Sequence, residues 1–240
     1  MVLSGHCRWY HKKNSTYKLF LRCEMRKTLL LMGPTIMIFI GLTLIGNVPL
    51  TFALFYGWLL LIPVYSSWKK QNHSQWKFSI TSRSLMLGMV SGTLVLVIIF
   101  AAVSYLFSFL IDLELIRSLL KQWDFDGKMI WVLIAVLLIL NPYLEENYWR
   151  NFIFQELKMS TSAGNAIIIS SFFYSLYHLL SLVELFNWPF NVLAVIPIFL
   201  AGLIWGIFRH KSGSLAAPIL SHVLADTGII LIYLVYIHTW

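Results

Sequence analysis

The chain has 240 residues, of which 59% are hydrophobic and only 12% are charged, and its mean hydropathy is +0.76. Soluble domains carry charge on about a quarter of their residues, so this composition excludes an ordinary soluble domain and predicts an all-α, polytopic membrane protein. The net charge of +8 comes from basic residues in short segments beside apolar runs. Because such residues set membrane orientation, we expect the lipid bilayer, and no nucleic acid, as a partner.

Seven apolar segments follow one another along the chain, and each approaches or exceeds the ~20 residues that cross a bilayer. They are expected at 28–45, 48–65, 85–111, from 129 to near 157, at 163–182, at 190–208 and from 214 toward the C-terminus. Pro218 and Gly228 interrupt the last segment, so we predict a bundle of seven to eight transmembrane helices. Between the third and fourth segments, the pattern LELIRSLLKQW predicts a short interfacial helix.

Lysine and arginine alternate between the two ends of these segments. They gather in the N-terminal stretch, in the loop 66–83, after the fourth segment and at Arg209 and Lys211, whereas the turns at 46–47 and 184–187 have none. The positive-inside rule then places the N-terminus in the cytoplasm. The compact chain, with no evident organelle-targeting segment, points to a bacterial plasma membrane. We divide it into a basic cytoplasmic segment (1–27), the first transmembrane helices (28–128) and a C-terminal core (129–240).

Few ionisable side chains lie inside the apolar segments. Such a group costs a few kcal/mol at membrane depth, so it persists where it is paired or used. The clearest case is the stretch Asn141-Pro142-Tyr143-Leu144-Glu145-Glu146-Asn147-Tyr148-Trp149-Arg150. Glu146 and Arg150 are spaced i, i+4 and can pair on one helix face, which leaves Glu145 without a local partner. We expect Glu146 and Arg150 to organise a site and Glu145 to be its catalytic base. Pro142 is expected to kink the helix and let water reach Glu145.

Two later segments carry histidines. His178 lies one turn after Tyr174, and His222 and Asp226 are again spaced i, i+4. Taken singly, His178 fits a packing role and the second pair fits helix stabilisation. Together with Glu145 they support attack of water on a carbonyl, because a carboxylate beside a histidine can take a proton and a second histidine can stabilise the oxyanion. Glu145, His178 and His222 could instead ligate zinc, although we favour a site without a cofactor.

These residues resemble the CPBP family of intramembrane proteases, which includes the type II CAAX prenyl endopeptidases and the bacteriocin-processing and immunity proteins of the Abi group. The three motifs of that family are Glu-Glu-x-x-x-Arg, Phe-x-x-x-His and His-x-x-x-Asn or Asp. They correspond here to Glu145–Arg150, Tyr174–His178 and His222–Asp226, with tyrosine in place of phenylalanine. The resemblance covers about 129–230, and the first three segments carry no family signal.

The resemblance implies an endopeptidase in which Glu145 and His178 activate water while His222 and Asp226 bind the oxyanion. An ionised Asp226 cannot donate a hydrogen bond, so it would have to be protonated or to orient His222 instead. The implied substrate is a membrane-associated peptide or protein, cut near its C-terminus or leader, with bacteriocin processing or self-immunity as the role in bacteria. From their heights along the segments, the site residues are expected to meet within the membrane, at a site open to the cytoplasmic side.

Two alternatives from other classes stay open. A non-catalytic immunity or scaffold protein would bind a bacteriocin or another partner through the same polar pocket, and it predicts that Glu145→Gln leaves the cellular phenotype intact. A proton-coupled transporter would use a Glu/His relay, but the sequence shows no pair of broken-helix repeats.

Overall fold

The computed structural model describes residues 15–70, 79–123, 125 and 127–238, and within them the chain forms helices and no strand. In the labels, α marks α-helices and η marks π-helical segments. The first half contains α1 (Ser15–Ile38), η1 (Phe39–Ile45), α2 (Val48–Lys70), α3 (Ser82–Leu110) and α4 (Leu113–Gln122). The second half contains α5 (Met129–Ala135), η3 (Val136–Leu140), α6 (Asn141–Glu146), η4 (Asn147–Ile153), α7 (Phe154–Lys158), α8 (Ala163–Leu185), α9 (Phe190–Leu193), α10 (Val195–Ser212), α11 (Ala216–Ile232) and η5 (Tyr233–Ile237).

Seven helical stretches of the described chain are long and apolar enough to cross a membrane, which confirms the predicted all-α membrane bundle. They are Glu24–Ile45, Val48–Lys69, Ser82–Leu110, Met129–Lys158, Ala163–Leu185, Phe190–Ser212 and Ala216–Ile237. Pro218 stands in the first turn of α11, where a missing N–H removes no intrahelical hydrogen bond. The helix therefore runs on past Gly228, and the last segment is one span rather than two.

Local sequence explains where several helices begin and end. Thr81 and Ser84 form a capping box at the start of α3, each side chain accepting from the other's backbone N–H. Asp112 caps α4, the short helix that the sequence predicted before the fourth span. Gly46 closes η1 with a φ of +70° and turns the chain into α2. Helix α1 begins at Ser15, so it takes in much of the expected segment 1–27, whose first residues lie outside the described part.

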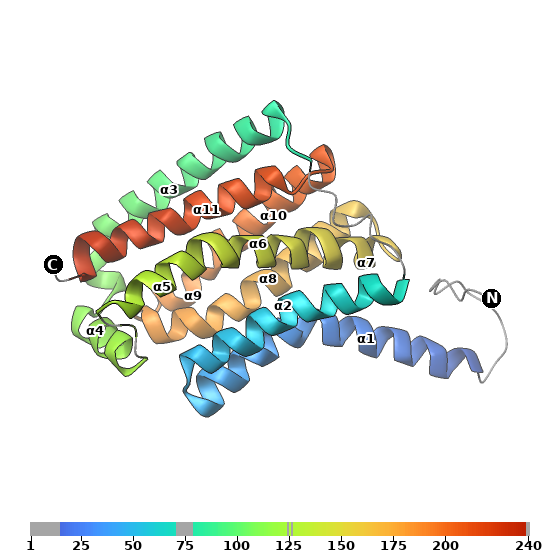
Figure 1. The fold of residues 1–240 in the computed structure, drawn as a ribbon, viewed down its shortest axis with the longest axis horizontal. Coiled ribbons are helices and arrows are strands. Elements are labelled where there is room, and N and C mark those ends of the chain that lie inside the picture. Colours follow the sequence, from blue (N-terminus) through green and yellow to red (C-terminus); the bar gives the residue numbers. More distant parts are fainter. Residues whose placement is uncertain (1–14, 71–78, 124, 126, 239–240) are drawn as a thin grey trace.

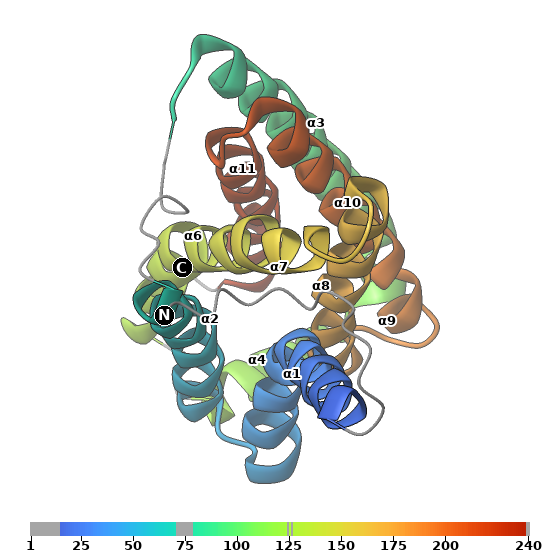
Figure 2. The ribbon, with the colours of Figure 1, turned by 90° about the vertical axis from the view of Figure 1, so that its right-hand side faces the viewer.

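The fourth span, from α5 to α7, lies in the middle of the bundle. Figure 2 shows α6 and α7 with α3 and α11 on one side and α1 and α2 on the other. Every side chain from Leu144 to Phe154 is buried, whichever way it points. A helix that is buried all round belongs to the core. Polar groups on this helix are therefore shielded from lipid and need partners on the neighbouring helices.

Helix α3 lies on the outside of the bundle and packs along α11 (Figure 1). A Cβ atom added to Gly92 would stand 2.8 Å from Cβ of Leu224 and 2.9 Å from Cα of Ser221, so glycine is what allows this close approach. Helix α11 carries His222 and Asp226. It is therefore held between a lipid-facing helix and the central span.

Tyr148 ties the central span to the first two helices. Its hydroxyl donates to the backbone carbonyl of Leu30 over 2.6 Å and accepts from Nε1 of Trp58 over 2.8 Å. The tyrosine is fully buried, so both hydrogen bonds satisfy a group that water does not reach. Helices α1 and α2 thus hold the span that carries the acidic pair.

Candidate active site

The fourth span changes its helical geometry on both sides of the acidic pair. The π-helical segments η3 and η4 flank α6, and the N–H of Asn141 bonds to the carbonyl of Val136, five residues back. Pro142 favours this local change, since it has no N–H for the carbonyl four residues before it. Short π-helical stretches are frequent at functional sites. The disturbance expected at Pro142 thus takes the form of a widened turn within one continuous span.

Glu146 and Arg150 form the predicted ion pair one turn apart on this helix. Nε of Arg150 lies 3.2 Å from Oε2 of Glu146, and the two side chains are 1% and 0% exposed. The guanidinium also lies 4.1 Å from the centre of the Tyr174 ring and 5.4 Å from that of Trp205. Aromatic faces attract a cation. Arg150 therefore joins the central span to α8 and α10.

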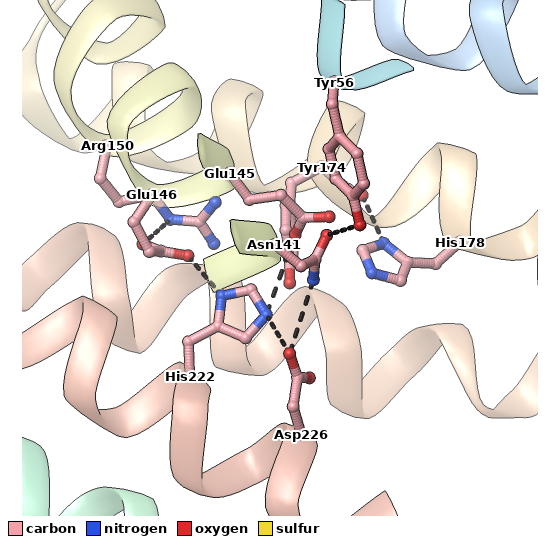
Figure 3. Close-up of polar contacts among 9 residues, drawn as sticks. All are labelled: Tyr56, Asn141, Glu145, Glu146, Arg150, Tyr174, His178, His222 and Asp226. Carbon is pink, nitrogen blue, oxygen red and sulfur yellow. Dashed lines mark hydrogen bonds and ion pairs between the residues drawn. The ribbon is translucent and has the colours of Figure 1, made fainter. Parts of the chain in front are cut away.

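His222 is the side chain that lies close to all three acids (Figure 3). Its Nδ1 is 3.0 Å from Oε1 of Glu146, while its Nε2 is 3.5 Å from Oδ2 of Asp226 and 3.9 Å from Oε2 of Glu145. The imidazole also stacks on the Trp205 ring, with 4.4 Å between ring centres and 19° between planes. The ring is therefore fixed at both nitrogens and on one face.

Glu145 has much weaker contacts than its neighbour Glu146. Its side chain is almost fully buried, and its Oε2 has no hydrogen-bond partner among the described residues. The 3.9 Å that separates this oxygen from Nε2 of His222 is too long for a hydrogen bond. The oxygen is consequently available to accept a proton from a molecule bound beside it.

His178 is held in one tautomer by its own helix. Its Nδ1 lies 2.9 Å from the backbone carbonyl oxygen of Tyr174. A carbonyl only accepts, so Nδ1 carries the hydrogen and Nε2 of the neutral ring is left as an acceptor. The structure shows no hydrogen bond or ion pair between the side chains of Glu145 and His178, both of which it describes. Both side chains line the wall of one cavity.

This cavity has a volume of about 360 Å³ and is lined mainly by apolar side chains. Its polar lining comes partly from α2, α6 and α8, in the side chains of Tyr56, Asn141, Glu145, Tyr177, His178 and Ser181. The remainder consists largely of leucine, isoleucine, valine and aromatic residues from α1, α2, α4, the fourth span and α11. The arrangement is an apolar chamber with a group of polar side chains on its wall.

The direction of the cavity differs from the one that the sequence predicted. It extends from Glu145 toward Val48 at the start of α2, toward α4 and toward Tyr233 after α11. This is the end of the bundle where Figure 1 shows α4, away from α7 and from the start of α1. We expected an opening toward the cytoplasmic end, where the N-terminus was placed. Toward that end the central span carries the buried side chains of Tyr148, Trp149 and Phe152, which are 0–2% exposed.

Tyr56, Asn141 and Trp205, which stacks on His222, are residues of the site that were missed from the sequence. The hydroxyl of Tyr56, on α2, donates to Oδ1 of Asn141 over 3.2 Å, and Nδ2 of Asn141 donates to Oδ2 of Asp226 over 3.5 Å (Figure 3). Tyr56 belongs to an apolar span that has no ionisable residue to draw attention to it. Asn141 carried a usable signal, because it lies one turn before Glu145 and shares its helix face.

The structure does not bring the residues of the zinc alternative together as one ligand set. Among the described residues, no group of three or more His, Cys, Asp or Glu side chains is arranged so that it could hold a metal ion. Within the expected set of Glu145, His178 and His222, the two histidines point to different partners. His222 turns both nitrogens toward carboxylates, while His178 faces the cavity and the carbonyl of Tyr174.

Comparison with known protein families adds an independent observation. Residues 127–228 match the family described as type II CAAX prenyl endopeptidase Rce1-like. The matched segment covers less than half of the chain but contains all three motifs, from Glu145 to Asp226, while Tyr56 lies outside it. No curated protein and no solved structure matches the chain.

Proposed function

Since residues 127–228 match the type II CAAX prenyl endopeptidase Rce1-like family, we propose that this multi-pass membrane protein is an endopeptidase in which Glu145 and His178 activate water. The observation that carries the proposal is that these two proton acceptors line one apolar cavity within the bundle. An unbonded carboxylate oxygen on Glu145 and an accepting Nε2 on His178 are the groups that a water nucleophile needs.

The proposed reaction starts with a water molecule between these two groups. Its oxygen attacks the carbonyl carbon of the scissile peptide bond while Glu145 takes one of its protons and His178 accepts a hydrogen bond from the other. The electron pair of the C=O bond moves to the carbonyl oxygen. When the tetrahedral intermediate collapses, the C–N bond breaks and Glu145 returns its proton to the leaving nitrogen. His222, held by Glu146 and Trp205, keeps a nitrogen 3.9 Å from Glu145.

The proposed substrate is a membrane-associated peptide or protein. The cavity wall is mainly apolar, and it matches a peptide that carries apolar side chains or a lipid better than it matches a polar one. The family description names prenyl endopeptidases, so a prenylated C-terminal peptide is the first substrate to test. Bacteriocin processing or self-immunity is the role that we propose for such an enzyme in a bacterial plasma membrane.

The test compares purified wild-type protein with Glu145→Gln and His178→Ala in proteoliposomes. A quenched fluorescent peptide ending in a farnesylated CAAX sequence serves as substrate, beside the same peptide without the farnesyl group. We expect both variants to lose hydrolysis by a factor of about 10² or more while eluting as folded protein. Glu184→Gln is the matched control, because it makes the same change at an exposed position far along α8, and it should keep full turnover.

Wild-type turnover in Glu145→Gln would refute the mechanism. If cellular resistance to a bacteriocin also survived in that variant, the non-catalytic immunity protein would be the better description. Elemental analysis with a chelator challenge addresses zinc separately, since stoichiometric zinc together with activity that chelation abolishes would favour a metalloprotease.

A further inference from the structure

The oxyanion that forms during peptide hydrolysis needs a hydrogen-bond donor beside the cavity. The resemblance implies His222 and Asp226, but neither side chain lines the cavity where the substrate would lie. Both nitrogens of His222 face carboxylates, and an ionised Asp226 has no hydrogen to donate. A side chain on the cavity wall that can donate a hydrogen bond would therefore supply the oxyanion with what an ionised Asp226 cannot.

Asn141 has the position and the hydrogens for this task. It lines the cavity, and it lies on the same helix face as Glu145, one turn earlier. Its amide nitrogen carries two hydrogens, and the structure uses one of them for Asp226. No other described side chain accepts from this nitrogen, so the second hydrogen is available to a bound substrate.

The amide is hydrogen-bonded at both ends, and Asp226 selects its orientation. The Tyr56 hydroxyl donates to the amide oxygen, and an ionised Asp226 can only accept from the amide nitrogen. A flipped amide would set its oxygen against the carboxylate of Asp226, which has no hydrogen to give it. Tyr56 and Asp226 thus hold the donating end in place before any substrate binds, which is the condition for effective oxyanion stabilisation.

We propose that Asn141 is a catalytic residue whose amide N–H donates to the oxyanion, and that Tyr56 and Asp226 are positioning residues for it. This inference rests on the proposed peptidase function. When water attacks, the C=O electron pair moves to the carbonyl oxygen, and the Asn141 amide stabilises that charge until the C–N bond breaks. The carboxylate of Asp226 then accepts a hydrogen bond from the Asn141 amide and holds it in position, which explains why an aspartate serves at position 226.

The decisive variant is the exchange Asn141→Asp/Asp226→Asn, which keeps one amide, one carboxylate and the hydrogen bond between them. It moves the amide to the position that does not line the cavity. We expect an unfolding midpoint close to that of the wild type, a kcat lower by a factor of about 10²–10³, and a KM changed less than about threefold. Asn141→Ala should show the same split between kcat and KM with Asp226 retained.

Tyr56→Phe tests the positioning role, since it frees the amide oxygen while leaving the ring in place. A loss of about threefold to tenfold in kcat is expected, again with little change in KM. If the exchange variant or Asn141→Ala keeps a kcat within about threefold of the wild type, or if the loss falls on KM, the inference is wrong. Glu145→Gln in the same assay separates the two claims. Inactive Glu145→Gln beside an active exchange variant would refute only the role of Asn141, whereas active Glu145→Gln would refute the peptidase mechanism itself.

Discussion

The buried pair of Glu146 and Arg150 gives a quantitative test of the structure through Arg150→Met. This change keeps a long side chain of similar reach but removes the charge that faces Glu146. Because both side chains are at most 1% exposed, water cannot replace the lost partner. Removing one member of a buried ion pair costs about 3–5 kcal/mol, since it leaves an uncompensated buried charge.

Two further variants divide this cost into parts. Arg150→Lys keeps the charge but loses the planar group that lies over Tyr174, 4.1 Å from the ring centre. A desolvated cation–π contact contributes about 2 kcal/mol, so this variant should be destabilised by roughly that amount. The double variant Glu146→Gln/Arg150→Met removes both charges of the pair. It should therefore be destabilised by about 2 kcal/mol less than the sum of the losses in Glu146→Gln and Arg150→Met.

The assay is equilibrium unfolding of the purified protein by SDS in mixed micelles, followed by tryptophan fluorescence. Arg117→Met is the comparison variant, because Arg117 is 38% exposed on α4, pairs with Glu114 at 3.8 Å and donates to the carbonyl of Ile237 over 3.2 Å. A partly exposed ion pair contributes about 0–1 kcal/mol and one more hydrogen bond about 1 kcal/mol, so this variant should lose clearly less than Arg150→Met. The reasoning fails if Arg150→Met costs no more than Arg117→Met, or if the double variant is as unstable as the sum of its parts.

Two other predictions concern packing. Gly92→Ala should destabilise the contact between α3 and α11 by about 1–3 kcal/mol, because its Cβ would stand 2.8 Å from that of Leu224. Gly57→Ala, with open space around the same added atom, should be neutral or slightly stabilising, and equal unfolding free energies for the two would contradict the packing. Tyr148→Phe should cost about 1–3 kcal/mol in the same SDS titration, since it leaves the carbonyl of Leu30 and the Trp58 N–H without their shared partner. The lipid-facing control Tyr105→Phe, at a side chain 86% exposed, should cost almost nothing, and a similar loss in both would argue against the buried network.

The helical bundle was largely predictable, because apolar length and turn signals act locally. The seven spans, the short helix α4 and the pairing of Glu146 with Arg150 all follow from spacing along one stretch of chain. The sequence left open whether the last segment would divide at Pro218 or Gly228, and the structure shows one span because of where the proline stands. A proline in the first turn leaves a helix intact.

The detailed geometry of the site depends on contacts that spacing does not specify. Nothing in the sequence indicates that Tyr56, 85 residues before Asn141, would fix its amide. The contact of His222 with Glu146, at 3.0 Å, is closer than its contact with Glu145, although motif spacing treats the two acids alike. The direction of the cavity was missed for the same reason. It depends on how the neighbouring helices pack around the central span, and spacing along the chain does not specify that packing.

The hydrogen bonds of Tyr148 also determine how far the protein can be shortened. A truncated protein limited to residues 127–228, the segment that matches the family, would keep every motif residue. It would lack Leu30 and Trp58, and so Tyr148 would bury a hydroxyl with neither acceptor nor donor. It would also lack Tyr56, leaving the Asn141 amide held at one end only. The smallest unit that preserves this arrangement therefore includes α1 and α2, and the boundaries of the family match do not mark the boundaries of an excisable enzyme.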